Sequence, residues 1–297
     1  MKKTIKNAPF QIWCFCLAVT LVLSLSLLGL AGGKNHIAQG NSLSTAIEDS
    51  KEDNKESPKK IALPIVMYHS IFDKNVGKYV LSPSQLEKDL EYIVKNGYTT
   101  IFASDLINYV ENGVCLPDKP IMLTFDDGAK TKYLYAYPLL KKHNLRAVFF
   151  VVGKWTDDEE TKKGSSLTYE MIDTMHKSGL IEIQHHSYDM HKDKGRIGMS
   201  QKKGESDIEY KEALRQDLTR MKDGFKGRLG IEMTAVAYPY GAFSALSNSI
   251  LQELGYKAAF ICTEGINYID RDSDLFMLKR YNRPSGISSE EFFRRMR

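Results

Sequence analysis

The feature that most limits the fold of this chain is a repeated alternation of two patterns. From residue 61 onward, short apolar runs alternate about seven times with longer amphipathic stretches. Each apolar run predicts a buried strand, and each amphipathic stretch predicts a helix that packs on the sheet. Strands that alternate with helices usually pair in parallel. The sequence therefore predicts an α/β fold whose parallel strands close, or nearly close, into a barrel with helices outside.

The expected elements follow from these runs and from the capping residues beside them. The expected strands cover residues 61–70, 98–102, 121–125, 147–152, 180–184, 234–238, 256–262 and 275–278. The expected helices cover residues 84–96, 104–111, 133–143, 168–178, 207–224 and 247–254, with a last helix from Ser288. Ser104 is the expected N-cap of the second helix. A stretch rich in Lys and Gly, residues 192–206, is expected to be a surface excursion.

The N-terminal region differs from the rest of the chain. Residues 1–33 contain three lysines near the start and an uncharged run from Ile12 to Ala31. The run is long enough for a membrane anchor, while Gly29-Leu30-Ala31 would serve as a cleavage site, so we expect either a signal-anchor helix or a signal peptide. The polar, mixed-charge residues 34–60 predict a flexible linker. We expect residues 61–297 to form the folded domain, exported to the extracellular face of the membrane or secreted.

Charge and cysteine content exclude some classes of protein. The formal net charge is +4, and three of these charges belong to the N-terminal lysines. A body of nearly zero net charge gives no reason to expect a nucleic-acid partner, and we expect a monomer. Cys115 and Cys262 are the two cysteines outside the N-terminal apolar run. They are too few for a disulfide scaffold, and the sequence leaves open whether they pair.

Two adjacent carboxylates end one of the expected strands. Asp126 and Asp127 directly follow the apolar run Ile121–Phe125 and precede a glycine. In α/β folds, catalytic groups collect at the carboxyl ends of strands. Neighbouring residues point in different directions, so one aspartate could hold a cation while the other handles a proton. The sequence Asp-Asp-Gly is also common in surface turns, so this motif alone does not decide between a functional site and a turn.

A second strand end carries three histidines. His185, His186 and His191 account for three of the seven histidines of the chain. Two imidazoles and one carboxylate would hold a zinc ion and leave an open position for water. A single histidine in an α/β protein is usually structural, but the pair of strand ends together favours a metal site.

These motifs resemble those of a known family. Thr124–Gly128, then His186-Ser187 with His191, and then Tyr238-Pro239-Tyr240-Gly241 are similar to the polysaccharide deacetylase family, also called the NodB-homology or carbohydrate esterase family 4 domain. The resemblance covers the chain from about residue 61 onward. It implies a distorted (β/α) barrel, an N-acetylated polysaccharide as substrate and a divalent metal, expected to be Zn²⁺, with Co²⁺, Ni²⁺ or Fe²⁺ as alternatives.

The resemblance also implies roles for single residues. Asp126 would be the general base, and Asp127, His186 and His191 would be the metal ligands. The interval between the two histidines is five residues, where much of the family has four. The subgroup that acts on poly-N-acetylglucosamine shares the longer interval. His185 stays open as a competing ligand, although the serine after His186 favours His186.

The motif Tyr238–Gly241 implies further contacts in the site. The backbone N–H of Tyr240 would stabilise the oxyanion. We group Tyr238, Pro239 and Arg280 with the substrate side of the site. Most members of the family have an arginine ahead of the Pro-Tyr-Gly motif that orients the base. This chain has none there, so Arg280 or Arg283 is the expected replacement.

The general acid is a further departure from the family pattern. Most members take it from a late Leu-x-His, but no histidine follows His191 in this chain. The poly-N-acetylglucosamine subgroup takes it from a Tyr-His at the end of the first strand, which matches Tyr68-His69. The resemblance therefore implies that His69 protonates the leaving amine.

Together these patterns predict a metal-dependent hydrolase. It would remove N-acetyl groups from N-acetylglucosamine units of a cell-surface or extracellular polysaccharide, either poly-N-acetylglucosamine or peptidoglycan, with the first favoured by the motifs. Two alternatives stay open. One is a catalytically impaired barrel that only binds glycan, and the other is a deacetylase of an O-acetyl ester or a small amide.

Overall fold

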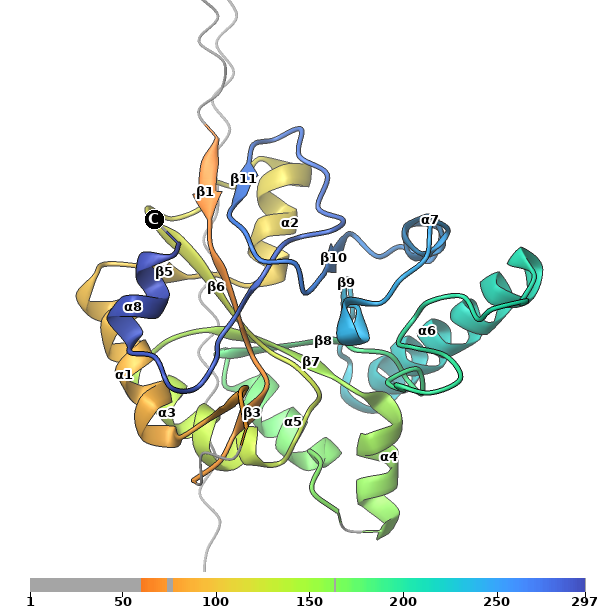
Figure 1. The fold of residues 1–297 in the computed structure, drawn as a ribbon, viewed down its shortest axis with the longest axis horizontal. Helices are drawn as coiled ribbons and strands as arrows, with labels where there is room; N and C mark the ends of the chain where they lie inside the picture. The colour runs from red at the N-terminus through yellow and green to blue at the C-terminus, as the bar shows by residue number, and fades with distance from the viewer. Residues whose placement is uncertain (1–59, 74–76, 163, 297) are drawn as a thin grey trace, which may run out of the picture. The chain divides into compact units, whose positions relative to one another are not determined.

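The computed structural model describes residues 60–73, 77–162 and 164–296 (Figure 1). The expected signal segment, residues 1–33, and the expected linker up to residue 59 lie outside the described residues. Within the described ranges, no helix combines the length and the hydropathy that crossing a membrane requires.

The centre of the fold is a curled sheet in which every strand runs parallel to its neighbours. Its order is β10-β9-β8-β7-β6-β2-β12. The short strand β5 (Thr99–Thr100) also pairs with β6, at the first two residues of β6, and β2 pairs with the residues after them. The strands of this order are β2 (Ile65–Tyr68), β6 (Pro120–Phe125), β7 (Ala147–Val151), β8 (Ile181–His185), β9 (Ala235–Ala237), β10 (Ala258–Phe260) and β12 (Tyr281–Asn282). The parallel α/β architecture expected from the alternating patterns is confirmed.

One segment bonds to β10 at one edge of this sheet and, as strand β12, forms the other edge beside β2. The N–H of Leu278 donates to the carbonyl of Ala259 in β10 over 2.8 Å. A few residues later, the N–H of Arg283 donates to the carbonyl of Met67 in β2 over 3.0 Å. Residues 278–283 therefore join the two edges, and the carboxyl ends of the strands face a common mouth.

The two faces of the sheet are both buried, which explains the continuous apolar runs. In β7, Phe149 packs in the cluster that includes the outer helices, whereas Val148 and Phe150 pack in a second cluster on the other face. Side chains alternate between faces along a strand, so both sets are withdrawn from water.

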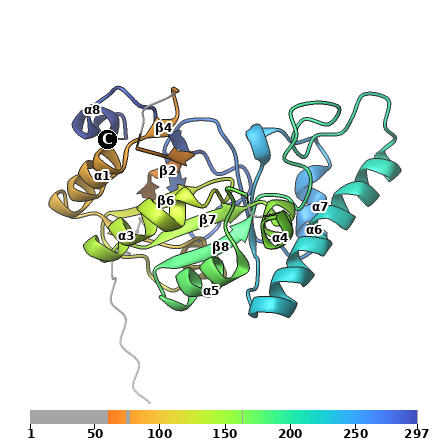
Figure 2. The same cartoon turned by 90° about the horizontal axis from the view of Figure 1, so that it is seen from below.

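Helices cover the outer face, as Figures 1 and 2 show, with α1, α3 and α5 along one flank and α6 beside α7 on the other. The helices are α1 (Pro83–Lys95), α2 (Ala103–Asn112), a π-helical turn η1 (Lys132–Ala136), α3 (Tyr137–His143), α4 (Gly153–Lys162), α5 (Tyr169–Lys177), α6 (Asp207–Leu229), a 3₁₀ turn η2 (Pro239–Gly241), α7 (Ser247–Glu253) and α8 (Ser289–Arg294). Four of them begin at a hydroxyl side chain that accepts a hydrogen bond from the first turn: Ser82, Thr168, Ser206 and Ser288.

Helix α6 is longer than expected. The sequence analysis ended it at Gly224, because glycine commonly follows the last residue of a helix. The helix instead continues to Leu229, and Gly230 takes the left-handed conformation, with φ of 69°. Phe225 is buried on the core side, so tertiary packing carries the helix through the glycine.

Other boundaries also differ from the expectation. Pro64 divides the first expected strand, so that β1 (Ile61–Leu63) leaves the main sheet and pairs antiparallel with β11 (Asn267–Ile269). A further short pair, β3 (Ser70–Ile71) with β4 (Val80–Leu81), follows it. Helix α4 was not expected.

The expected N-cap at Ser104 is wrong. Helix α2 begins one residue earlier than that serine, with Phe102 in the N-cap position. The side chain of Asp105 accepts a hydrogen bond from the Phe102 N–H over 2.8 Å and satisfies the helix start in place of a serine hydroxyl.

Candidate active site

The two aspartates at the end of β6 point in different directions. Asp127 has a left-handed backbone, with φ of 77°, and Gly128 follows with φ of 85°. The backbone of Asp126 is still held by the sheet, because its N–H donates to the carbonyl of Tyr68 over 3.0 Å. Aspartate is among the few residue types that tolerate the left-handed region. The turn therefore separates the two carboxylates and gives each its own surroundings.

Asp127 lies against two histidines. Its Oδ1 is 3.1 Å from Nε2 of His191 and 3.5 Å from Nε2 of His186. One ligand atom from each of the three residues fits within 4.8 Å of the others. Two imidazoles and a carboxylate are the ligand set of many catalytic zinc sites, which keep one position open.

The hydrogen bonds behind the histidines favour a cation between the three residues. Nδ1 of His186 lies 2.7 Å from the carbonyl of Ala237, an acceptor that requires the hydrogen on Nδ1. Nε2 of a neutral His186 then presents a lone pair to the Asp127 carboxylate. Two electron-rich atoms repel each other unless a proton or a metal lies between them, so the donor set fits a divalent metal.

His191 is held on its other side by aromatic residues. Its Nδ1 lies 3.2 Å from the hydroxyl of Tyr240, and the two ring centroids are 4.6 Å apart. Trp155 approaches the same imidazole edge-on at 4.9 Å. Tyr240 is half exposed and has a left-handed backbone, with φ of 58°, so its side chain stands beside the histidine at the mouth.

Asp126 is buried and paired with Arg280. The guanidinium NH1 and NH2 groups donate to Oδ1 and Oδ2 of Asp126 over 2.7 and 2.8 Å. The Arg280 Nε–H donates to the carbonyl of Ile261 over 3.1 Å, which fixes the plane of the fork. Burial is the largest single effect and would raise the pKa of the Asp126 carboxyl, but the charge and hydrogen bonds of Arg280, together with His186 and His69, leave that pKa below its usual value.

Of the two arginines considered as the partner of the base, the structure places Arg280 there. Arg283 instead donates to both carboxylate oxygens of Asp89, over 2.8 and 2.9 Å, away from the site. Arg280 was also grouped with the substrate side of the site. Its guanidinium is fully buried and bonded to Asp126, so it does not reach the substrate side with which it was grouped.

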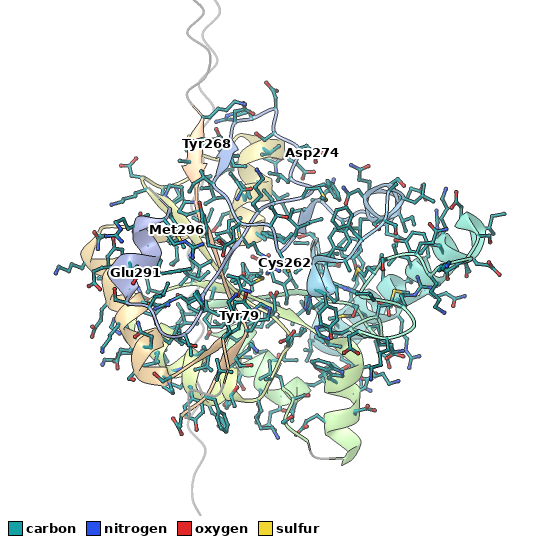
Figure 3. The ribbon with its side chains drawn as sticks, in the orientation of Figure 1. Tyr79, Cys262, Tyr268, Asp274, Glu291 and Met296 are labelled. Carbon is teal, nitrogen blue, oxygen red and sulfur yellow. The ribbon has the colours of Figure 1, made fainter. Side chains whose placement is uncertain are left out.

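His69 follows β2 and lies near the two aspartates. The charges of Asp126 and Asp127 both act on its imidazole, but burial is the larger effect and lowers the pKa of His69. Its Nδ1 is buried, and no hydrogen-bond partner for that atom is found among the described residues. The ring of Tyr79, which is labelled in Figure 3, lies 5.9 Å away.

His185 lies outside the cluster. Its Nδ1 accepts a hydrogen bond from the Ser187 N–H over 2.9 Å, and its ring meets Tyr256 edge-on. Burial lowers the pKa of His185 to about 3, so it is neutral at ordinary pH. The neighbouring His186 is therefore the histidine that the structure brings to Asp127.

The residues of the Tyr-Pro-Tyr-Gly motif divide into buried and exposed ones. Tyr238 and Pro239 are buried, and the Tyr238 hydroxyl donates to Oδ1 of Asn248 over 2.6 Å. Their side chains support the turn from behind. Only Tyr240 reaches the mouth.

Lys132 also lies near the two aspartates, although its place in the sequence does not predict this. This lysine is fully buried in η1, and burial lowers its pKa while the charges of Asp127 and Asp126 oppose that shift. No partner for its Nζ is found within the described ranges. A lysine in the first turn of a helix is usually exposed, so the sequence pattern gave no signal for it.

Cys262 also lies near the site. Its Sγ is 4.0 Å from Sδ of Met67, and burial raises the pKa of its thiol, against the effect of Arg280. Cys115 is exposed, and both cysteines are free, which answers the open question of whether they pair.

Comparison with known proteins places these residues in a family context. Residues 113–259 match the family model described as polysaccharide deacetylase. A poly-beta-1,6-N-acetyl-D-glucosamine N-deacetylase of Escherichia coli (strain K12) is 24% identical in an alignment of 232 residues that covers 68% of this chain and 34% of that protein. The chain thus spans about a third of the length of this relative.

Two further proteins are matched over a larger share of their own length. A protein of the same description from Staphylococcus aureus (strain MRSA252) is 24% identical over 199 residues, which cover 67% of this chain and 66% of that protein. The structure of the Streptococcus pyogenes deacetylase PplD in complex with acetate superposes with a TM-score of 0.69 at 24% identity, over 80% of this chain and all of that one. The likeness to this structure establishes the fold.

Proposed function

The chain contains a polysaccharide deacetylase domain, and from this premise we propose that it is a metal-dependent hydrolase that removes N-acetyl groups from N-acetylglucosamine units of an extracellular polysaccharide. The observation that carries the proposal is the convergence of Asp127, His186 and His191 beside a second carboxylate, Asp126, which is paired with a buried arginine. A group of residues that only stabilises the fold would not need both the converging ligand set and the arginine-paired carboxylate beside it.

The three converging residues would hold the metal. A divalent ion there supplies a Lewis acid that polarises the acetyl carbonyl and makes a water more acidic. Asp126 accepts the proton of the attacking water. Arg280 keeps that carboxylate ionised and fixes both of its oxygens, so the base does not rotate away from the water.

The remaining steps concern the oxyanion and the leaving group. The backbone N–H of Tyr240, in the left-handed turn beside His191, is the proposed donor to the oxyanion. His69 donates a proton to the nitrogen as the C–N bond breaks, so acetate and a free amine are the products.

The surroundings of the histidines support a sugar substrate. Tyr79 stands next to His69, and Tyr240 stands next to His191, and both phenol rings are more than a third exposed. Aromatic rings at a mouth offer flat apolar faces on which sugar rings can stack, while polar groups fix orientation. Such stacking suits either polymer, and the descriptions of the relatives favour poly-N-acetylglucosamine over peptidoglycan.

The proposal includes a location. The charged tip and apolar run of residues 1–33 support export, with the domain held at the outer face of the membrane or released from it. A polymer outside the cell would then be within reach of the mouth.

Acetate release tests the function. The full-length chain is incubated with poly-β-1,6-N-acetylglucosamine, chitin oligomers and peptidoglycan, before and after chelation and after return of Zn²⁺, Co²⁺, Ni²⁺ or Fe²⁺. We expect release that chelator abolishes and metal restores, fastest on the first polymer. Binding of oligomers without acetate release under any metal would identify a glycan-binding barrel instead.

A further inference from the structure

The two proposed histidine ligands differ in how they are anchored. His186 directly follows β8, and its N–H donates to the carbonyl of Val151 in the neighbouring strand over 3.0 Å. His191 lies five residues further on, beyond the sheet, so the sheet does not fix its position. The segment 187–190 between the two histidines, here called the ligand loop, must therefore be held by something else.

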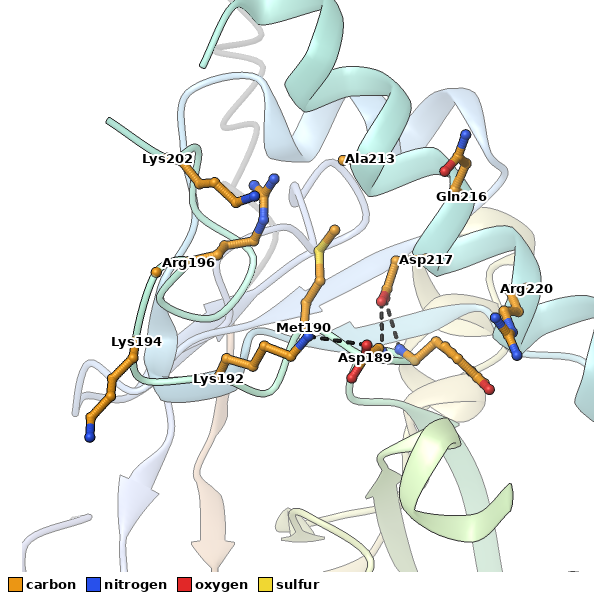
Figure 4. A pocket seen from close by; sticks show the side chains of 12 residues that line it. Asp189, Met190, Lys192, Lys194, Arg196, Lys202, Ala213, Gln216, Asp217 and Arg220 are labelled. Atoms are coloured by element: carbon orange, nitrogen blue, oxygen red, sulfur yellow. Dashed lines mark hydrogen bonds and ion pairs between the residues drawn. The ribbon is translucent and has the colours of Figure 1, made fainter. Parts of the chain in front are cut away.

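One side of the ligand loop is held by a single carboxylate of helix α6. Oδ1 of Asp217 accepts a hydrogen bond from the Tyr188 N–H over 2.7 Å, and Oδ2 accepts one from the Asp189 N–H over 2.7 Å (Figure 4). Asp217 is 8% exposed, so water contributes little to these bonds. Buried charge-assisted bonds of this kind are stronger and more directional than bonds between neutral groups.

The other side of the ligand loop is held by the start of helix α4. The N–H groups of Gly153 and Lys154 donate to the carbonyls of Ser187 and Tyr188 over 3.1 and 2.9 Å. A Cβ atom at Gly153 would lie 2.8 Å from the Tyr188 ring, so this close approach requires glycine. Ser187 itself is in the left-handed region, with φ of 73°. The loop is thus held from both sides in a conformation that a free chain would rarely adopt.

We propose that Asp217 is a positioning residue that sets the distance between Nε2 of His186 and Nε2 of His191, and through it the metal affinity of the site, without touching the metal. The inference rests on the proposed function only in taking these two histidines as ligands. The two oxygens of this carboxylate satisfy two consecutive N–H groups of the loop between the histidines, groups that would otherwise be buried without an acceptor.

The direct test is Asp217→Asn in the full-length chain. An amide offers one oxygen and one NH₂ group, so one of the two backbone N–H groups would face another donor. Loss of partners that orient ligands typically weakens metal binding by about 10–100-fold, and we expect a rise of that size in the Kd for Zn²⁺, measured by calorimetry. The absorption spectrum of the Co²⁺ form should also change, because the angle between the ligands changes.

Two variants serve as matched controls. Asp223→Asn removes the same charge from an exposed position on the same helix. Glu212→Gln removes a second exposed carboxylate of the same helix, one that accepts a hydrogen bond from Gln216, and leaves both N–H groups of the loop with their acceptor. Both should keep the wild-type Kd within about threefold and keep the Co²⁺ spectrum. That pattern separates the effect of losing the two hydrogen bonds from the effect of losing a negative charge.

The outcomes separate this inference from the proposed function. Wild-type protein that binds no divalent metal would overturn both. Wild-type binding with an unchanged Kd and an unchanged Co²⁺ spectrum in folded Asp217→Asn would overturn the inference alone. If Asp217→Asn does not fold, Asp217→Glu decides, since it keeps the charge but shifts the oxygens by one methylene. A weaker Kd with an altered spectrum in Asp217→Glu supports the inference, and wild-type values overturn it.

Discussion

At the scale of single residues, the site depends on giving neighbouring groups of the same type different surroundings. Asp126 is enclosed with Arg280, whereas Asp127 faces two imidazoles. His185 is buried and neutral, whereas His186 turns Nε2 toward Asp127. The sequence shows two aspartates and two histidines side by side, and only the direction of each side chain assigns their tasks.

Asp126→Asn tests the assignment of the base. The amide does not accept the proton of the attacking water, so turnover should fall by about 10²–10⁴-fold while metal content stays at the wild-type value. The substitution also leaves the Arg280 charge unbalanced in a buried site, and the free energy of unfolding should fall by about 3–5 kcal/mol. Near-UV circular dichroism, metal content and acetate release measure the three effects. Substantial turnover in a folded, metal-loaded variant would remove Asp126 from the role of base.

His69→Ala tests the general acid. On an N-acetyl amide the rate should fall by about 10²–10⁴-fold, because the amine leaves poorly without a proton. On an aryl acetate ester the loss should be much smaller, since a phenolate leaves without help. Equal losses on the two substrates would instead assign His69 to shaping the site or binding the glycan.

The pH profile follows from the same pair of residues. The base must be ionised and the acid protonated, so the rate rises with pH through the pKa of Asp126 and falls through the pKa of His69. Burial lowers the His69 pKa from its usual value of 6.5, and the falling limb should therefore lie at lower pH than a free histidine would give. In His69→Ala the residual amide rate should lack this limb, and its persistence would point to another acid.

At the scale of elements, the sequence was most informative where a single apolar run is enough to predict a buried strand. The expected strands 121–125 and 147–152 are buried on both faces, and the structure confirms them as β6 and as β7, which ends at Val151. Elements fixed by partners far along the chain were missed. Asp217 and the N–H groups it binds are 28 and 29 residues apart, and helix α4 packs on the ligand loop rather than following a strong amphipathic pattern of its own. The candidate site was therefore predictable in composition, and its supports were not.

Gly224→Ala tests how packing overrides the helix-ending signal in α6. Gly224 has helical geometry, and a Cβ atom there would meet no other atom within 4 Å. Alanine should therefore raise the free energy of unfolding by about 0.5–1 kcal/mol, measured in urea. Gly230→Ala is the control. Its φ of 69° penalises a side chain, so that variant should be less stable than the wild type. A loss of stability in Gly224→Ala would mean that the helix needs a flexible point there.

At the scale of the whole molecule, the mouth collects groups from the entire sheet. Asp126 and Asp127 follow β6, His186 follows β8, and Tyr240 follows β9. His69 follows β2, and Arg280 comes from the segment that joins the two edges. A metal held by Asp127, His186 and His191 would link β6 to the ligand loop. Binding of the metal would then stabilise the folded domain as a unit.

Chelation should therefore lower thermal stability. A metal at 100 times its Kd stabilises the folded state by about 2.7 kcal/mol, which for a domain of this size corresponds to roughly 5–10 °C in Tm. Asp127→Ala and His191→Ala should lose this response to metal, and His185→Ala should keep it. Calorimetric scans with and without Zn²⁺ measure the shift. A full response in His191→Ala, or none in His185→Ala, would contradict the ligand assignment.

The segment that joins the sheet edges also bears on the order in which the site matures. Arg280 follows Asp126 by 154 residues, so during synthesis the base exists well before its partner. At about 5–20 residues per second, that interval lasts roughly 8–30 s. Throughout it, a carboxylate destined for burial has no counter-charge and is better left in water. The last parallel pairing of the sheet thus brings the counter-charge that allows the Asp126 carboxylate to leave water, so this pairing and the burial of that carboxylate are one event in time.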